Sequence, residues 1–338
     1  MSDEYLWDRS GEPDAEIMRL EGLLGRLRHD RPAPDLPSAI AELRPARLRR
    51  LVPGLVIAAV LLFAAGTWIA IDFWPTNPGW QVASIEGTPR VGQAVMSTPG
   101  RLGVGQALVT DSTSRATLRV DGFGQIEVEP ETRLQLLKAT SEEEHLRLER
   151  GTIHAEILAP PYTFLVYTPS AYALDMGCAY TLHVDDDGSG WLRVTSGWVE
   201  FQRGFLQTLV PAGAMAETRP GIGPGAPFFD DASEKLLSAL RMINFESGDS
   251  QARADALTTV LAEARKRDAF TLLNLFKRVA PEDRGRIYDR LAELVPPPAG
   301  ATREGAIAGD PKAIDPWWGV LVVSPVKKGH KTPPRIEY

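Results

Sequence analysis

Residues 51–71 form an unbroken apolar segment, LVPGLVIAAVLLFAAGTWIAI, that contains no charged side chain. At 1.5 Å of rise per residue, a helix of this length measures about 31 Å, close to the hydrocarbon thickness of a bilayer. A bilayer also requires the backbone to satisfy its own hydrogen bonds, which a helix does. The segment predicts a transmembrane helix over 51–72. A buried core helix seldom lacks charge for so long, and the apolar region of a cleaved signal peptide is shorter.

The flanks of this segment predict its orientation. Four arginines lie between residues 44 and 50, whereas Trp68, Phe73 and Trp74 mark the other end. Positive residues stay on the cytoplasmic side, and aromatic residues collect at membrane interfaces. We therefore expect residues 1–50 to form a cytoplasmic tail and the chain after Asp72 to be exported, with the lipid bilayer as a direct partner.

The tail contains one amphipathic pattern. Four apolar residues recur at i, i+3, i+7 and i+10, which predicts a helix of about 17 residues beginning near Glu12 with an apolar stripe on one side. Such a helix is marginal alone, and the tail offers no second apolar element to cover it. The stripe either lies on the membrane surface or pairs with itself, or it binds in a groove of a cytoplasmic partner. We favour a partner, and the candidate residues are Leu6, Trp7, Ile17, Leu20, Leu24 and Leu27.

Beyond the apolar segment, residues 78–220 alternate polar and apolar side chains. Ala116, Leu118 and Val120, for example, are separated by Thr117 and Arg119. Turn dipeptides interrupt this period of two at Asp121-Gly122, Arg150-Gly151, Asp187-Gly188 and Ser196-Gly197. The pattern predicts about ten strands with one polar and one apolar face. The exported domain is therefore expected to be mainly β, an antiparallel sandwich or roll.

A Gly/Pro-rich stretch near residue 219 separates this domain from a small helical region at 228–295. Four apolar stripes predict four short helices: Leu236, Leu237, Leu240 and Ile243; Leu257, Val260, Leu261 and Ala264; Leu272, Leu273 and Phe276; Ile287, Leu291 and Leu294. Three prolines at 296–298 end the last of them. Residues 296–338 are expected to be irregular, apart from Trp317 and Trp318, which should dock on a domain.

Five strings between residues 80 and 218 follow one another in a recognisable order: LGVGQALVTDSTSRATLRVDGFGQIEVEPETRLQLL, LERGTIHAEI, FLVYTPSAYALDMGCAYTLHVD, LRVTSGWVEF and LVPAGAMAET. Together they resemble the FecR-like family of single-pass membrane regulators. The motif positions are Gly151, Thr168, Pro169, Gly177, Tyr180, Gly197 and Gly213. Where family members often have Gly-Thr-x-Phe, this chain has Gly177-Cys178-Ala179-Tyr180.

Each motif position has an expected physical role. Gly151 and Gly197 permit tight turns, because glycine adopts positive φ without strain. Thr168-Pro169 imposes an extended start on the next segment. Gly177 allows a close backbone approach before Tyr180 turns inward.

The resemblance implies a function that the residues alone do not. It implies a location in the bacterial inner membrane, with a cytoplasmic N-terminus and a periplasmic C-terminus. It further implies that the tail contacts an extracytoplasmic-function sigma factor, while the β domain receives a signal from an unknown periplasmic protein or ligand. The helical region looks like an extension found in some relatives.

The sequence contains no recognisable catalytic or cofactor site. Its five histidines lack metal-ligand spacing, and those at 145, 154 and 183 are expected to be solvated on strand surfaces. Asp185-Asp186-Asp187-Gly188 fits a hairpin turn better than a calcium loop. The net charge of −7 gives no reason to expect direct nucleic-acid binding, and the single cysteine, Cys178, excludes an internal disulfide.

We therefore expect a regulator without enzymatic activity or cofactor. The alternative is a structural or polymer-binding envelope protein for which the tail is only an anchor. A periplasmic hydrolase is a third hypothesis, disfavoured because no nucleophile, base or metal arrangement occurs.

Overall fold

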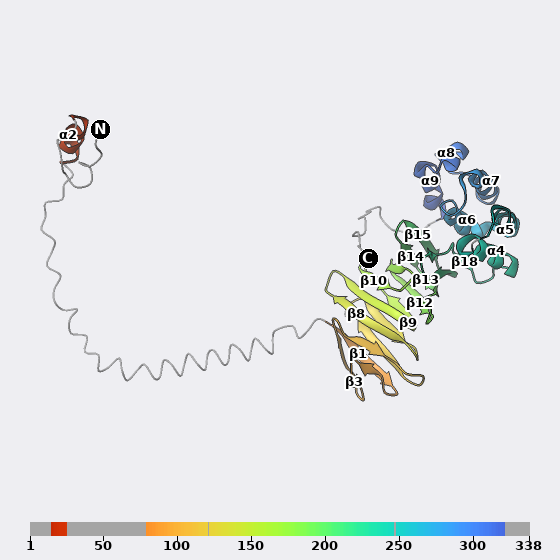
Figure 1. The fold of residues 1–338 in the computed structure, drawn as a ribbon, viewed down its shortest axis with the longest axis horizontal. Coiled ribbons are helices and arrows are strands. Elements are labelled where there is room, and N and C mark those ends of the chain that lie inside the picture. The colour runs from red at the N-terminus through yellow and green to blue at the C-terminus, as the bar shows by residue number, and fades with distance from the viewer. Residues whose placement is uncertain (1–14, 26–78, 121, 247, 322–338) are drawn as a thin grey trace. The chain divides into compact units, whose positions relative to one another are not determined.

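The computed structural model describes residues 15–25, 79–120, 122–246 and 248–321 (Figure 1). The predicted membrane segment at 51–71 and the candidate residues Leu6, Trp7 and Leu27 lie outside the described residues. Among the residues that are described, no helix combines the length and apolar character needed to cross a membrane. The chain divides into two units, residues 1–74 and 75–338.

The described part of the first unit is one helix, α2 (Ala15–Leu24). It lies within the range predicted for the amphipathic helix. Glu16 in its first turn is favourably placed for the positive end of the helix dipole. None of its residues is buried.

The second unit begins with two β-sheets that share one strand. The first sheet contains β1 (Gly79–Glu86), β4 (Gly100–Gly103), β6 (Arg115–Val120), β7 (Gly124–Val128), β12 (Cys178–Val184), β13 (Gly190–Ser196), β16 (Ala214–Arg219), β17 (Gly223–Pro224) and β18 (Phe228–Phe229). The second contains β2 (Arg90–Val91), β3 (Ala94–Val95), β5 (Ala107–Val109), β8 (Arg133–Ala139), β10 (Phe164–Tyr167), β11 (Tyr172–Asp175), β14 (Trp198–Arg203) and β15 (Leu206–Pro211).

The shared strand is β9 (Glu144–Ile157), which passes from one sheet to the other. Its first half pairs with β8 and β10 in the second sheet, and its second half pairs with β7 and β12 in the first. The change of sheet falls at Gly151, which has φ +90° inside the continuous strand, so the tight turn predicted at Arg150-Gly151 is not formed. A β-carbon there would lie 2.7 Å from Cβ of Thr132, so glycine is required for both its conformation and its lack of a side chain.

Alternation of side chains builds the core between the sheets. In β12, Cys178, Tyr180, Leu182 and Val184 are buried while the residues between them are partly exposed. The same period-two burial occurs in β6 and β7. A mainly β domain is thus confirmed, and the inward position expected for Tyr180 is observed.

Two features of the β domain differ from the prediction. β10 pairs with the first half of β9 in parallel, because the chain leaves β9 in the first sheet and crosses back to begin beside Glu144, where β9 itself starts. The structure also has sixteen strands from β1 to β16 rather than about ten. Strands of two to four residues, such as β2 and β3, are too short to display a period of two.

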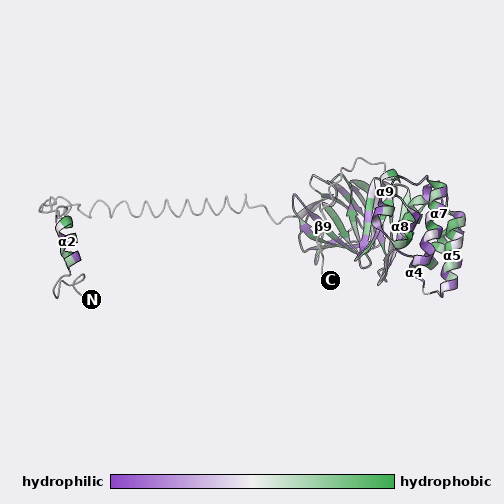
Figure 2. Ribbon diagram, turned by 90° about the horizontal axis from the view of Figure 1, so that it is seen from above, coloured by the Kyte–Doolittle hydropathy of each residue, from purple (hydrophilic) through white to green (hydrophobic). Residues whose placement is uncertain are grey.

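In the described part of the chain after the sheets there are six α-helices: α4 (Glu234–Phe245), α5 (Ser250–Glu263), α6 (Ala269–Leu275), α7 (Arg284–Leu294), α8 (Arg303–Ala308) and α9 (Pro311–Leu321), with 3₁₀ turns η3 (Lys266–Asp268) and η4 (Pro281–Asp283). The side chains of Ser233, Asp249 and Thr302 cap α4, α5 and α8. Polar and apolar residues alternate along these helices, as expected of helices with one buried face (Figure 2).

The C-terminal region corrects two predicted boundaries. Phe228 and Phe229 form β18 in the first sheet, so the helices begin at Glu234 rather than at 228. The stretch predicted to be irregular contains α8 and α9, whose shortness and internal Pro316 conceal helical periodicity. Trp317 is buried in the helical core, in agreement with the expectation that it docks on a domain.

Hydrogen bonds and aromatic packing are among the contacts that hold the helices on the sheets, on the side of the β domain that carries β14 to β18 (Figure 1). The Arg278 guanidinium donates to the Pro224 carbonyl oxygen at 2.7 Å and to Thr208 Oγ1 at 2.5 Å. Phe270 lies between Trp198 and Trp318, with ring centroids 5.3 and 6.0 Å away. These contacts join the helical region to the β domain.

Candidate partner-binding surfaces

The apolar face of α2 is exposed among the described residues. The exposed fractions of Leu20, Leu23 and Leu24 are 53%, 62% and 60%. At 100° per residue, these three lie within one arc that also includes Ile17, which is partly exposed. The structure therefore places three of the candidate residues, Ile17, Leu20 and Leu24, on one helix face.

Leu23 belongs to the same face and is absent from the predicted set. It lies 60° from Leu20 around the helix, so it widens the stripe on one side. The predicted set follows the series i, i+3, i+7 and i+10 from Ile17 and so omits Leu23, although Leu23 is three residues after Leu20 and a helical-wheel projection includes it. Met18 is also exposed, at 56%, but on a different side of the helix.

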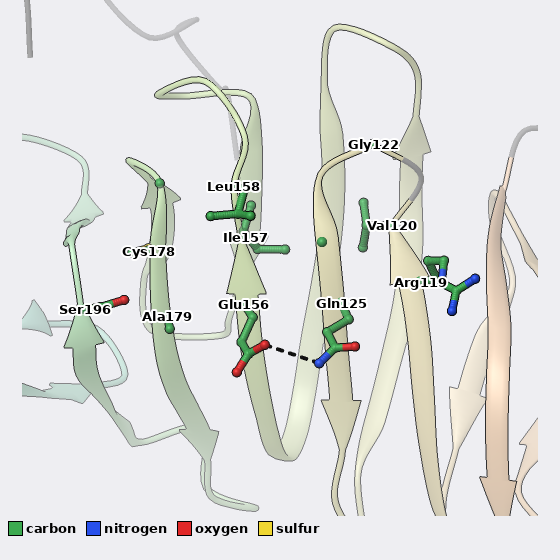
Figure 3. Close-up of a pocket in the computed structure, with 12 residues that line it drawn as sticks. Arg119, Val120, Gly122, Gln125, Glu156, Ile157, Leu158, Cys178, Ala179 and Ser196 are labelled. Carbon is green, nitrogen blue, oxygen red and sulfur yellow. Dashed lines mark hydrogen bonds between the residues drawn. The ribbon is translucent and has the colours of Figure 1, made fainter.

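A second surface is an open groove of about 710 Å³ at one end of the first sheet (Figure 3). The end of β6, the start of β7, the end of β9, the β11–β12 turn and the end of β13 meet there. The lining residues are Arg119, Val120, Gly122, Gly124, Gln125, Glu156, Ile157, Leu158, Gly177, Cys178, Ala179 and Ser196. Most of them are apolar or small, and Gln125 Nε2 donates to Glu156 Oε2 at 3.2 Å at the rim. The groove can accommodate a small ligand or a protruding side chain.

Leu158 is a strongly exposed apolar side chain in the lining of this groove, with 88% of its surface accessible. Its backbone N–H donates to the Phe123 carbonyl oxygen at 2.6 Å, which continues the pairing of β7 with β9 by one residue. The side chain is therefore presented from an ordered backbone. Sequence analysis did not identify Leu158, because a single apolar residue after a strand carries no periodic signal.

The motif glycines act differently from the prediction at the groove. Gly177 has φ +81°, but a β-carbon there would have only one ordinary contact, 3.7 Å from the Ala159 carbonyl oxygen. The close approach occurs at Gly197, φ +72°, where a β-carbon would lie 2.9 Å from Cβ of Cys178 and nearer still to the Gly177 carbonyl oxygen. Gly213 has φ +78° in the turn between β15 and β16.

Thr168 and Pro169 form a turn rather than the extended start that was expected. The Thr168 N–H donates to the Ala171 carbonyl oxygen at 2.8 Å, and Thr168 Oγ1 accepts from the Ala171 N–H at 3.0 Å. This closes the hairpin from β10 to β11. A threonine hydroxyl that bonds the local backbone favours such a turn.

A buried polar cluster supports the wall of the groove. The Asp175 carboxylate accepts from the Gly177 N–H at 2.6 Å and from the Cys178 thiol at 2.7 Å. Burial raises the pKa of Asp175 to about 6, and burial together with Asp175 raises the pKa of the Cys178 thiol. The nearby Tyr180 hydroxyl has no hydrogen-bond partner among the described residues. Cys178 is therefore a protonated packing residue rather than a nucleophile.

The histidines take part in cross-strand contacts. His154 lies 2.9 Å from Thr181 Oγ1, and His183 lies 2.7 Å from Thr152 Oγ1 while stacking on Trp191. His145 is half-buried against Tyr167, and burial lowers its pKa. These histidines are less solvated than expected. Within the described ranges, no three His, Cys, Asp or Glu side chains are grouped to hold a metal ion.

The acidic run at 185–188 forms the predicted hairpin turn between β12 and β13. The Gly188 N–H donates to the Asp185 carbonyl oxygen at 2.9 Å, and Val184 pairs with Gly190. The carboxylate of Asp187 accepts from the Ser189 N–H at 2.8 Å.

Comparison with known proteins identifies the central part of the β domain. Residues 106–200 match the family model described as FecR protein, a range that runs from β5 into β14 and contains β9 and the whole groove. No curated protein matches the chain.

Two solved structures of a candidate anti-sigma factor from Parabacteroides distasonis are similar to it, each with 14% identity and a TM-score of 0.33. They cover 39% and 46% of this chain, and the chain spans 63% and 73% of theirs. A likeness at this level supports no conclusion about fold or function.

Proposed function

We propose that this chain, whose residues 106–200 match the FecR family, is a single-pass inner-membrane regulator of the anti-sigma type. In this proposal, residues 51–71 span the bilayer and α2 binds a cytoplasmic sigma factor. The β domain lies in the periplasm and receives a signal from a protein or ligand. The chain itself catalyses no reaction.

The observation that carries the proposal is the exposed apolar face of α2. Ile17, Leu20, Leu23 and Leu24 form a continuous apolar surface on a helix none of whose residues is buried. Burying an exposed leucine contributes roughly 1.5–3 kcal/mol, so a partner groove that covered this face would gain substantially from it. The same face could also lie on the membrane surface, so the test below must distinguish binding to a protein partner from binding to lipid.

The order of the elements supports signal transmission. The apolar segment lies between α2 and the β domain, and that domain contains a groove in the part that matches the FecR family. A periplasmic ligand can change the cytoplasmic interaction only if it binds two states of the protein with different affinity. The β domain would provide that differential affinity, and α2 would be the element whose availability changes.

The test is capture of cytoplasmic proteins from solubilised membranes by the full chain and by two variants. In the first variant, Leu20 and Leu24 are both replaced by Asp, which places two charges on the apolar face. We expect at least about a hundred-fold weaker capture of a sigma factor, because the loss of two buried leucines exceeds about 3 kcal/mol.

The matched control is Met18→Asp. Met18 is as exposed as Leu20 but lies on another side of α2, so the control applies the same chemistry to the same helix. It should retain the sigma factor. Equal capture by all three proteins would reject α2 as the binding element. Recovery of the same envelope components by all three, with no transcription factor, would establish the structural envelope protein instead.

A further inference from the structure

The chain enters the β domain at the end that carries the groove. β1 begins at Gly79, and Gln81 pairs with Arg119 at the end of β6. Arg119 and the adjacent Val120 line the groove. The first described residues of the β domain and the groove therefore lie at the same end of the first sheet, which we call the groove end.

The proposed membrane span ends close to this point in the sequence. From Ile71 to Gly79 there are eight Cα-to-Cα steps, which reach at most about 29 Å when fully extended. If residues 51–71 cross the bilayer, this tether keeps the groove end near the membrane surface.

The groove end also presents a fixed apolar side chain. Leu158 is 88% exposed, and its backbone is held to Phe123. Figure 3 shows Leu158 beyond the end of β9, above Ile157 and Glu156. A large exposed apolar side chain on an ordered backbone is favourable when a bilayer interface covers it.

The opposite end of the β domain has a different character. Phe205, 98% exposed, is at the tip of the β14–β15 hairpin. The adjoining turns include the acidic run Asp185 to Asp187, since Arg203 contacts the Pro169 carbonyl oxygen and a β-carbon at Gly188 would touch Pro169. Anionic headgroups repel carboxylates, and Arg150 offsets only part of this acidic run by pairing with Asp186 at 3.3 Å, so this end is the less favourable one to face the membrane.

The end of α9 lies at the groove end as well. Trp318 packs through Phe270 on Trp198, which follows the groove-side turn at Gly197. The sequence after α9, residues 322–338, contains four Lys or Arg residues and one Glu. Basic residues that leave a domain at this end favour an anionic lipid surface nearby.

We infer that the groove end of the β domain docks on the phospholipid surface of the bilayer that anchors the chain, with Leu158 inserted at the headgroup level. The inference rests on the proposed membrane span. The groove rim would then meet the lipid surface. A ligand that entered the groove would compete with that contact and release the domain from the membrane.

The test places a fluorescent label at one position of the full chain, reconstituted in vesicles of phosphatidylethanolamine and phosphatidylglycerol. The label is attached at Leu158→Cys in one sample and at Phe205→Cys in the control. Both positions are exposed, so neither change disturbs the core. Wild-type protein treated with the same label checks that buried Cys178 does not react. Quenchers are attached to lipids near the headgroups or dissolved as iodide in the buffer.

We expect the lipid quencher to act several-fold more strongly at position 158 than at 205, and iodide to show the reverse. Equal quenching at both positions, or stronger lipid quenching at 205, would overturn the inference. Protection of position 158 from iodide in detergent without lipid would also overturn it, because a second copy or another protein would then be the cover. Flotation of the vesicles measures separately whether the chain is anchored in the membrane. A chain that floats but fails the quenching test would therefore contradict the docking inference and not the proposed anchor.

Discussion

Replacing Gly197 by alanine tests the packing that shapes the groove. Gly197 has φ +72°, and a left-handed backbone costs an L-residue roughly 1–2 kcal/mol. The added methyl group would also press on Cβ of Cys178 at 2.9 Å and on the Gly177 carbonyl oxygen, and overpacking of this kind costs typically about 1–3 kcal/mol. We expect Gly197→Ala to lower the free energy of unfolding by about 2–5 kcal/mol, measured by urea denaturation of the detergent-solubilised chain.

Gly204→Ala is the matched control for this change. Gly204 also has positive φ, +55°, but nothing lies within 4 Å of the position its β-carbon would occupy. It should therefore lose only the conformational part, about 1–2 kcal/mol. The difference between the two variants isolates the contact between the β13–β14 and β11–β12 turns. If both variants lose the same stability, the close approach at Gly197 contributes nothing and our account of this end of the domain is wrong.

Two further predictions concern buried groups. Because burial raises the pKa of Asp175 to about 6 from its ordinary 3.8, the folded state binds this proton more tightly than the unfolded state, and stability falls as the pH rises from about 4 to beyond 6. In Asp175→Asn the free energy of unfolding should no longer fall by about 3 kcal/mol over this pH range. If the free energy of unfolding depends on pH equally in both proteins, the prediction is wrong. Phe270→Ala removes the ring between Trp198 and Trp318 and should lower the free energy of unfolding by about 3–5 kcal/mol. In this variant we expect amide hydrogen exchange to accelerate more in α9 than in β12, relative to wild type. Unchanged exchange in α9 would show that Phe270 does not hold the helices to the sheets.

The local pattern of the sequence was sufficient to predict whether each long element is a strand or a helix. Side chains in β6, β7 and β12 alternate, and the four apolar stripes of the helical region fall on or beside α4 to α7. These signals arise from burial of one face of a regular element, which leaves a period of 2 or 3.6 in the sequence. Elements of fewer than two periods, such as β2, β3 and α8, left no such signal.

The candidate sites show the same division. Ile17, Leu20 and Leu24 were recognised because helical spacing brings them together whatever the rest of the chain does. Leu158 and Asp175 were missed because their importance depends on segments that meet only in the folded domain. No spacing along the sequence indicates that the residue after β9 is exposed, or that the carboxylate of the last residue of β11 is buried.

Short-range regularity therefore established that this is a β domain followed by helices, with an amphipathic helix and a charge-free segment before it. The tertiary structure decided that β9 joins both sheets, that β10 runs parallel to it, and that Gly197 rather than Gly177 makes the close approach. The physical reason is that strand pairing and turn-to-turn packing are non-local. Each partner has the same local preferences with many possible neighbours, and the choice among them depends on how the whole core closes.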